Sequence, residues 1–181
     1  MSDPKIYAPL FQPIEIGELK LPNRIVMAPM TRSSAGPEGI PNEAMAAYYA
    51  RRARHGVGLI ITEGVATNMS DALGHKNIPA ISNDVQEAGW RRVVDAVHAE
   101  GGKIGIQLWH SGRLGHSRTM PGDTHPVAPS AIIADENGAY VDPADPSTFD
   151  GSVPFEVPNE LSSAAIEEQI DQFAGCAERA K

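Results

Sequence analysis

A hydroxyl, a glycine, a primary amide and an indole lie at the ends of three short apolar segments of the chain. These residues are Thr31, Gly64, Gln107 and Trp109. Gln107 is the most informative, because a buried amide without a partner costs about 1–3 kcal/mol and needs either a protein partner or a ligand. Taken singly, the hydroxyl is typical of a turn or helix cap, the indole of a core and the glycine of a strand end. A ligand site is therefore one of two interpretations at this point.

The three apolar segments predict parallel strands. They cover residues 25–30, 59–64 and 103–109, are rich in Ile, Val and Leu, and lack regular polar alternation. Such segments are typical of strands buried on both faces of a parallel sheet. Because α/β proteins bind ligands at the carboxyl ends of parallel strands, the four residues above are expected at one edge of the sheet.

Three predicted helices alternate with these strands. Asn42 is the expected N-cap of the first helix, which ends in a cluster of basic residues before Gly56. The second helix carries an apolar stripe from Trp90 to Val97 and ends at two glycines. Ser162 is the expected N-cap of the third helix. The βαβαβα order calls for a parallel sheet with right-handed crossovers.

The chain divides into four segments within one domain. They are a hairpin in residues 1–24, the βαβαβ unit in 25–109, a long active-site loop in 110–160 and the third helix in 161–181. Within the loop, Asn137-Gly138 predicts a two-residue hairpin turn. Three strands leave two open sheet edges, and no strand follows the third helix. This pattern favours the front portion of a larger fold over a small free-standing sheet.

The composition excludes several classes of protein. Fifteen Lys and Arg residues stand against 23 Asp and Glu residues, which gives a formal net charge of −8. Nucleic acid and anionic membranes are therefore not expected partners. No apolar run is long enough to span a bilayer, no secretory signal is expected, and Cys176 is the single cysteine. We expect a cytoplasmic protein.

Other clusters of reactive residues favour structural interpretations. His110 and His116 could suggest a metal pair, but no third ligand stands at a fitting spacing, and we expect no metal site. A role in packing the loop is favoured for both histidines. The basic residues of the first helix are interpreted as charges that complement its C-terminus.

Five short motifs, in order and spacing, resemble the Old Yellow Enzyme family of flavin oxidoreductases. They are Leu10-Phe11-Gln12-Pro13, Asn23-Arg24 with Met27–Arg32, Ile61–Gly64, Gln107–Arg113 and Pro126–Ser130. Each motif is weak alone, but five in register are highly specific. The resemblance runs from about Leu10 to the last residue.

The resemblance implies a fold, a reaction and two cofactors. The fold would be a (β/α)₈ TIM barrel, of which this α/β chain supplies the first three βα units and an N-terminal capping hairpin. The cofactor would be FMN, held over the carboxyl ends of the strands, with NAD(P)H as the hydride donor. The reaction would be the reduction of activated C=C bonds, as in enones and other electron-poor alkenes.

The resemblance also implies individual roles. Residues 28–31 would contact the flavin, namely Ala28, Pro29, Met30 and Thr31. Thr31 would act catalytically by donating its hydroxyl near the C4 oxygen of the flavin and so stabilising negative charge on the reduced ring. Gly64 would permit close approach of the ring, and Gln107 would hydrogen-bond its pyrimidine edge. Trp109 would form a wall of the substrate pocket.

The sequence departs from the family pattern at two places. Many members carry an aromatic hydroxyl where this chain has His75, so His75 is expected in the substrate pocket. The family's substrate-binding histidine pair, proton-donating tyrosine and phosphate-binding arginine would all lie beyond the third helix. The chain is therefore expected to need a complementary chain or fragment that carries the rest of the barrel. The alternative is a non-catalytic half-barrel module with weak or no flavin binding.

Overall fold

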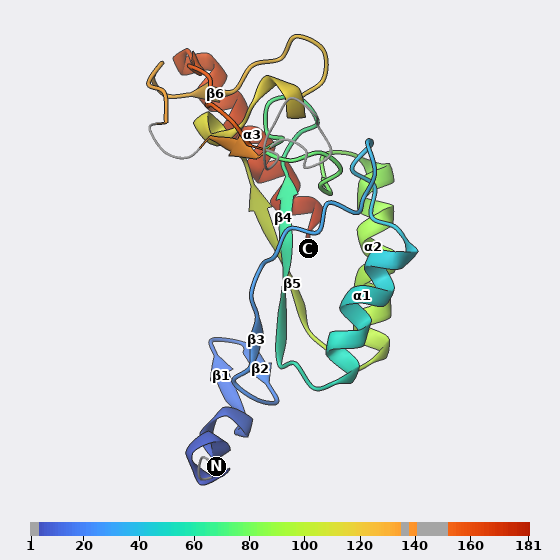
Figure 1. Ribbon diagram of the computed structural model, residues 1–181. Helices are drawn as coiled ribbons and strands as arrows, with labels where there is room; N and C mark the ends of the chain where they lie inside the picture. The colour runs from blue at the N-terminus through green and yellow to red at the C-terminus, as the bar shows by residue number, and fades with distance from the viewer. Residues whose placement is uncertain (1–3, 135–137, 141–151) are drawn as a thin grey trace.

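A three-stranded parallel sheet is the centre of the fold. The computed structural model describes residues 4–134, 138–140 and 152–181. The sheet has the order β3 (Val26–Met27), β4 (Leu59–Ala66) and β5 (Ile104–Trp109), and both pairings are parallel (Figure 1). The predicted α/β alternation of strands and helices is confirmed.

The first strand is much shorter than the predicted segment 25–30. Only two of its residues pair with β4, in the register Val26 with Leu59 and Met27 with Ile60. Pro29 has no N–H to donate to a ladder, so the chain leaves the sheet before it. In contrast, β4 continues two residues past its predicted end at Gly64, because Val65 and Ala66 pair with the end of β5.

Three α-helices connect or follow the strands: α1 (Glu43–Arg54), α2 (Asp84–Ala99) and α3 (Ser163–Arg179). The side chain of Asn42 accepts a hydrogen bond from the backbone N–H of Met45, and that of Ser162 accepts one from Ala165, so both predicted N-caps are confirmed. Asn83 caps α2 in the same way.

The core lies between α1, α2 and the sheet. Both helices lie on one side of β4 and β5 (Figure 1). Buried side chains from both helices and the sheet meet there, among them Tyr49, Ile60, Trp90, Val93 and Val97. Each Å² of apolar surface that these side chains remove from water stabilises the folded state by about 25 cal/mol.

The prediction that the strands are buried on both faces holds for the second half of β4, where residues 62–66 are all buried, but it is wrong for β3 and β5. All six residues of β5 are only half-buried, and Val26 of β3 is 48% exposed. The reason is that α1 and α2 cover one face, while nothing in the described part of the chain covers the other in the same way.

Smaller elements flank the sheet at its two ends. The predicted hairpin is present as β1 (Ile14–Ile16) paired antiparallel with β2 (Leu19–Leu21), after the 3₁₀ helix η1 (Pro4–Phe11). It lies at the end of the sheet where the strands begin, whereas α3 lies near the end where they finish (Figure 1).

The segment predicted as a loop contains short elements of its own. They are η2 (Gly112–Leu114), η3 (Ser117–Thr119), β6 (Val127–Ala128), β7 (Ala139–Tyr140), β8 (Ser152–Val153) and β9 (Asn159–Glu160). β6 pairs parallel with β9, and β7 pairs antiparallel with β8. The predicted turn at Asn137-Gly138 includes Asn137, which lies outside the described residues.

Candidate functional site

The carboxyl ends of the three strands bring the predicted site residues to one edge of the sheet. Gly64 of β4 is the register partner of Gln107 of β5, and Ala66 is the partner of Trp109. Thr31 belongs to the segment that follows β3, the other neighbour of β4. The expectation that these residues share one edge agrees with the sheet register for Gly64, Gln107 and Trp109, whereas Thr31 lies beyond the paired residues of β3.

A β-bulge in β4 separates two parts of this register. Ile61 lies opposite Gly105, but the next paired residue on β4 is Gly64 opposite Gln107, so two residues of β4 face one residue of β5. The hydroxyl of Thr62, inside the bulge, accepts a hydrogen bond from the backbone N–H of Gln107 at 3.0 Å and donates to the carbonyl of Glu63 at 2.8 Å. The Thr62 hydroxyl thus accepts the hydrogen bond that a backbone carbonyl of β4 would accept from Gln107 in a regular ladder.

The second residue of the bulge, Glu63, carries a buried carboxyl group. Its side chain is 1% exposed, and its Oε2 accepts hydrogen bonds from the backbone N–H of Arg32 at 2.9 Å and of Ser33 at 3.3 Å. The phenol of Tyr49 on α1 donates to Oε1 at 3.3 Å and accepts from the backbone N–H of Glu63 at 2.9 Å. Glu63 therefore joins α1, β4 and the segment that contains Thr31.

Burial and hydrogen bonding act in opposite directions on this carboxyl group. Burial raises the pKa of Glu63 above its ordinary value, whereas the hydrogen bonds from Arg32, Ser33 and Tyr49 favour the ionised form and lower it. Burial also raises the pKa of Tyr49, so its phenol keeps the proton that it donates to Glu63.

Trp109 lies in a space bounded by two glycines. A Cβ atom at Gly64 would stand 3.2 Å from Cδ2 of the indole, and one at Gly74 would overlap its Cη2 atom. The ring of His75 stacks on the indole, with centroids 5.9 Å apart and an interplanar angle of 12°. The two residues predicted for the substrate pocket are thus in contact, and the absent side chain of Gly64 makes room for Trp109.

Residues 28–31 and Gln107, which the sequence resemblance predicts to bind FMN, are accessible at this edge of the sheet. Residues 28–31 are all exposed, with Met30 at 48%, and Gln107 is half-buried rather than buried. Within the described part of the chain, neither the Thr31 hydroxyl nor the Gln107 amide makes a hydrogen bond. Two unpartnered polar side chains beside an exposed apolar segment form a chemically suitable donor set for the polar edge of a flavin ring.

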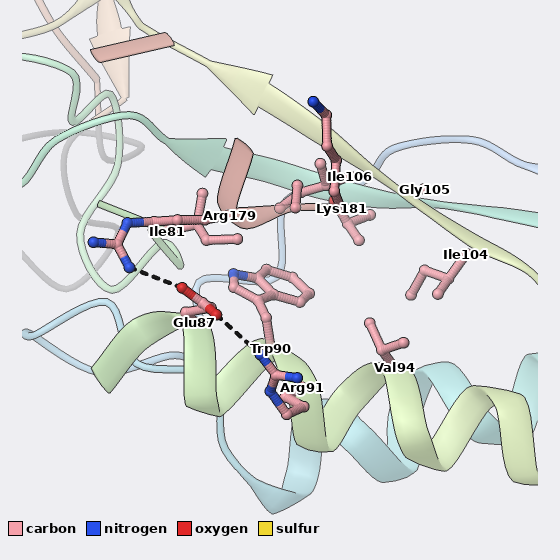
Figure 2. A pocket seen from close by; sticks show the side chains of 12 residues that line it. Ile81, Glu87, Trp90, Arg91, Val94, Ile104, Gly105, Ile106, Arg179 and Lys181 are labelled. Atoms are coloured by element: carbon pink, nitrogen blue, oxygen red, sulfur yellow. Dashed lines mark hydrogen bonds and ion pairs between the residues drawn. The ribbon is translucent and has the colours of Figure 1, made fainter. Parts of the chain in front are cut away.

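Cavities also lie away from this edge, and two of them adjoin α3. One, of about 190 Å³, lies between α2, β5 and the end of α3, and it is lined by apolar side chains such as Trp90, Val94 and Ile104 (Figure 2). At its rim Glu87 bonds both Arg179, at 2.8 Å, and Arg91, at 3.0 Å. A second, of about 640 Å³, lies between η2, β6 and α3. Neither is lined by a predicted flavin ligand.

The two histidines considered as metal ligands pack the loop instead. His110 Nδ1 accepts a hydrogen bond from the backbone N–H of Gly112, and its Nε2 lies 3.4 Å from Asp71. His116 Nδ1 accepts one from the N–H of Arg118. Among the residues that the structure describes, no three potential ligands gather at a metal site, and no helix has the length and apolarity to cross a membrane.

Asp71 links this edge of the sheet to α3. It accepts hydrogen bonds from Asn68 at 2.8 Å and from Gln169 of α3 at 3.1 Å. The contact with His110, together with these amide donors, holds the pKa of Asp71 below its ordinary value despite partial burial.

Sequence reasoning assigned no role to Glu63, Tyr49, Thr62 or Gly74. The signals available were the acidic residue inside an apolar strand segment, at Glu63, and the motif Ile61–Gly64 that contains it. Its partner Tyr49 lies 14 residues away on a helix, and Arg32 lies 31 residues away. No local pattern connects residues at such separations.

The chain resembles proteins of known family over nearly all its length. Residues 9–181 match the NADH:flavin oxidoreductase / NADH oxidase family. It is 36% identical over 167 residues to 12-oxophytodienoate reductase 7 of Oryza sativa subsp. japonica, covering 92% of this chain and 40% of that protein.

Solved structures give the same result. Morphinone reductase superposes with a TM-score of 0.82 at 40% identity, over 94% of this chain and 44% of that one. An old yellow enzyme homologue from Zymomonas mobilis superposes with a TM-score of 0.80 at 38% identity, again over 94% and 44%. The chain thus spans less than half the length of these relatives, and its sheet fits part of a TIM barrel.

These matches agree with the strand-end geometry and with the five sequence motifs. They point to FMN as the cofactor and to NAD(P)H as the hydride donor. The chain belongs to the NADH:flavin oxidoreductase / NADH oxidase family, which is the Old Yellow Enzyme family that its sequence resembles.

Proposed function

We propose that this chain forms part of an FMN-dependent ene reductase, which uses NAD(P)H to reduce activated C=C bonds such as those of enones. The chain contributes the first three βα units of a (β/α)₈ barrel and half of the flavin site. The observation that carries the proposal is a pair of polar side chains, Thr31 and Gln107, at one strand edge beside the exposed segment 28–30; neither side chain has a hydrogen-bond partner among the described residues.

Each residue at this edge has a task in the proposed site. FMN supplies the hydride-transfer chemistry. Thr31 donates its hydroxyl to the C4 oxygen region and stabilises the charge of the reduced ring, and Gln107 hydrogen-bonds the pyrimidine edge. The segment Ala28-Pro29-Met30 gives the ring an apolar surface. Trp109, stacked on His75, limits the space available to the alkene.

The rest of the barrel is proposed to come from a complementary chain or fragment. It would supply the groups that polarise the enone, protonate its α-carbon and bind the FMN phosphate. Charge-assisted hydrogen bonds to a phosphate contribute about 1.5–3 kcal/mol each, and each 1.4 kcal/mol changes a dissociation constant about tenfold. Loss of two or three such bonds would weaken FMN binding by several powers of ten.

The test measures FMN binding and NADPH-dependent reduction of cyclohexenone with and without the complementary barrel portion. The isolated chain should bind FMN poorly and show no detectable turnover, and addition of the other portion should restore the yellow colour and turnover together. Mass measurement of the released chromophore should give FMN.

Three outcomes would contradict the proposal. Released FAD would contradict the assignment of FMN as the cofactor. A colourless assembly would contradict flavin binding altogether and favour the alternative of a non-catalytic half-barrel module. Robust turnover by the purified chain, with no second polypeptide on a denaturing gel, would overturn the need for a complementary portion.

A further inference from the structure

The segment that contains Thr31 has few backbone contacts of its own. β3 pairs with β4 only through Val26 and Met27, and residues 28–31 are exposed. Two residues beyond Thr31, Ser33 has a φ of +52°, a left-handed conformation that is unfavourable for a residue other than glycine. Such a conformation persists only where other contacts hold it.

The carboxyl group of Glu63 supplies those contacts. Its Oε2 receives the backbone N–H groups of Arg32 and Ser33, the two residues directly after Thr31. Two converging N–H groups on one carboxylate oxygen fix both the position and the direction of the backbone there. The guanidinium of Arg32 lies 5.5 Å from the ring centroid of Tyr48, which adds a contact to α1.

The carboxyl group of Glu63 is itself held in place by a residue of α1. Tyr49 of α1 both donates to Oε1 and accepts from the backbone N–H of Glu63. Tyr49 is 1% exposed and belongs to the main core, so its hydroxyl has a fixed position. The β-bulge at Thr62 and Glu63 makes this possible, because it places the two residues outside the regular alternation of the strand.

We infer that Glu63, supported by Tyr49, is a positioning residue for the flavin-contacting segment: its buried carboxylate holds the backbone after Thr31, so that the Thr31 hydroxyl meets the flavin in a fixed place. Glu63 does not itself contact the flavin. The inference deepens the proposed function. Its effect on the flavin rests on that function, whereas its effect on the backbone of residues 32 and 33 does not.

The first test needs no flavin. In Glu63→Gln the neutral amide can no longer make charge-assisted bonds to both N–H groups, so hydrogen exchange of the Arg32 and Ser33 amides in the full chain should become about tenfold faster. Exchange of the β4 and β5 ladder amides should not change. Glu87→Gln is the matched control, because Glu87 is also a paired carboxylate but lies on α2, with Arg91 and Arg179 as its partners.

The second test uses the flavin-loaded assembly. Glu63→Gln should lower the reduction potential of bound FMN and slow flavin reduction by NADPH, because the Thr31 donor is less well placed. Glu87→Gln should leave both unchanged. Should Glu63→Gln not fold, Glu63→Asp keeps the charge but shortens the reach, and it should show the same two effects.

Two results would overturn the inference. One is unchanged exchange at Arg32 and Ser33 in a folded Glu63 variant. The other is faster exchange by the same factor throughout β4 and β5, since that would reduce Glu63 to a general stabiliser of the core. If exchange changes as expected but no flavin binds to the wild-type assembly, the positioning of the segment stands and the proposed function fails.

Discussion

The hydroxyl of Thr62 accepts a hydrogen bond from the backbone N–H of Gln107 at 3.0 Å, across the point where β4 and β5 change register. Gln107 is the residue proposed to hydrogen-bond the pyrimidine edge of the flavin, and the position of its backbone depends on this side chain of the neighbouring strand. The same bulge turns Glu63 toward Tyr49 and the segment after Thr31.

Replacement of Thr62 by Val tests this bond. Thr62 is 1% exposed, and Val keeps its shape but leaves the Gln107 N–H without its acceptor. The free energy of unfolding should therefore fall by about 1–3 kcal/mol, measured by chemical denaturation. The matched control is Thr67→Val: Thr67 is equally buried, but its hydroxyl has no hydrogen-bond partner among the described residues. Equal losses in both variants would count against the Thr62 bond.

Replacement of Thr31 by Ala should act on the flavin rather than on the fold. Thr31 is exposed, and its side chain has no hydrogen bond within the described chain, so stability should change little. In the assembled enzyme the FMN reduction potential should fall and reduction by NADPH should slow, because a donor near the C4 oxygen favours the more negative reduced ring. The reoxidising half-reaction should slow less or even become faster.

Stopped-flow measurement of the two half-reactions separates this effect from general damage. Thr31→Ser keeps a hydroxyl and should behave nearly as the wild type. If Thr31→Ala slows both half-reactions equally, or if the Ser variant is as impaired as the Ala variant, the proposed role of the hydroxyl is wrong.

Added methyl groups at the two glycines beside Trp109 should displace the indole. Gly64→Ala places a Cβ atom 3.2 Å from the ring, and Gly74→Ala overlaps it. Overpacking of this kind costs about 1–3 kcal/mol, and Gly74→Ala should be the worse of the two. Tryptophan fluorescence and chemical denaturation would show the changes.

Gly175→Ala provides the control, since nothing lies within 4 Å of the added Cβ and the residue is inside α3. This variant should be more stable by about 0.5–1 kcal/mol. A Gly74→Ala variant as stable as the wild type, with unchanged fluorescence, would show that the added methyl group does not displace the indole, and the prediction would be wrong.

The contacts of Asp71 predict a loss of stability in acid. Its folded pKa lies below the ordinary value of 3.8, so the stability that its ionised form contributes is complete above pH 3.8 and is lost as the pH falls through the folded pKa. Asp71→Asn should therefore be less stable than the wild type above pH 3.8, and the difference should shrink below it. Urea denaturation at pH values above and below 3.8 measures the free energy of unfolding of this variant. Asp95→Asn, at an exposed position of α2, is the control. If the stability difference between Asp71→Asn and the wild type did not vary with pH, the ionisation of Asp71 would not be the cause of the loss in acid.

Much of the secondary structure follows from local sequence. Asn42 and Ser162 cap their helices as predicted, since a capping side chain bonds a backbone N–H within the next three residues. The three strand positions, the hairpin and the family are likewise readable from short motifs. The length of β3 was overestimated, because apolar composition does not show where backbone pairing ends, and β3 ends before Pro29.

The geometry of the site was decided by tertiary structure. The sequence by itself placed Thr31, Gly64, Gln107 and Trp109 at strand ends, because a parallel sheet brings those ends together. It could not reveal that Glu63 holds the segment after Thr31, or that Gly74 makes room for Trp109, since these contacts join residues 30 or more positions apart. A bulge shifts every later side chain of its strand, and only the paired strand shows where that shift occurs.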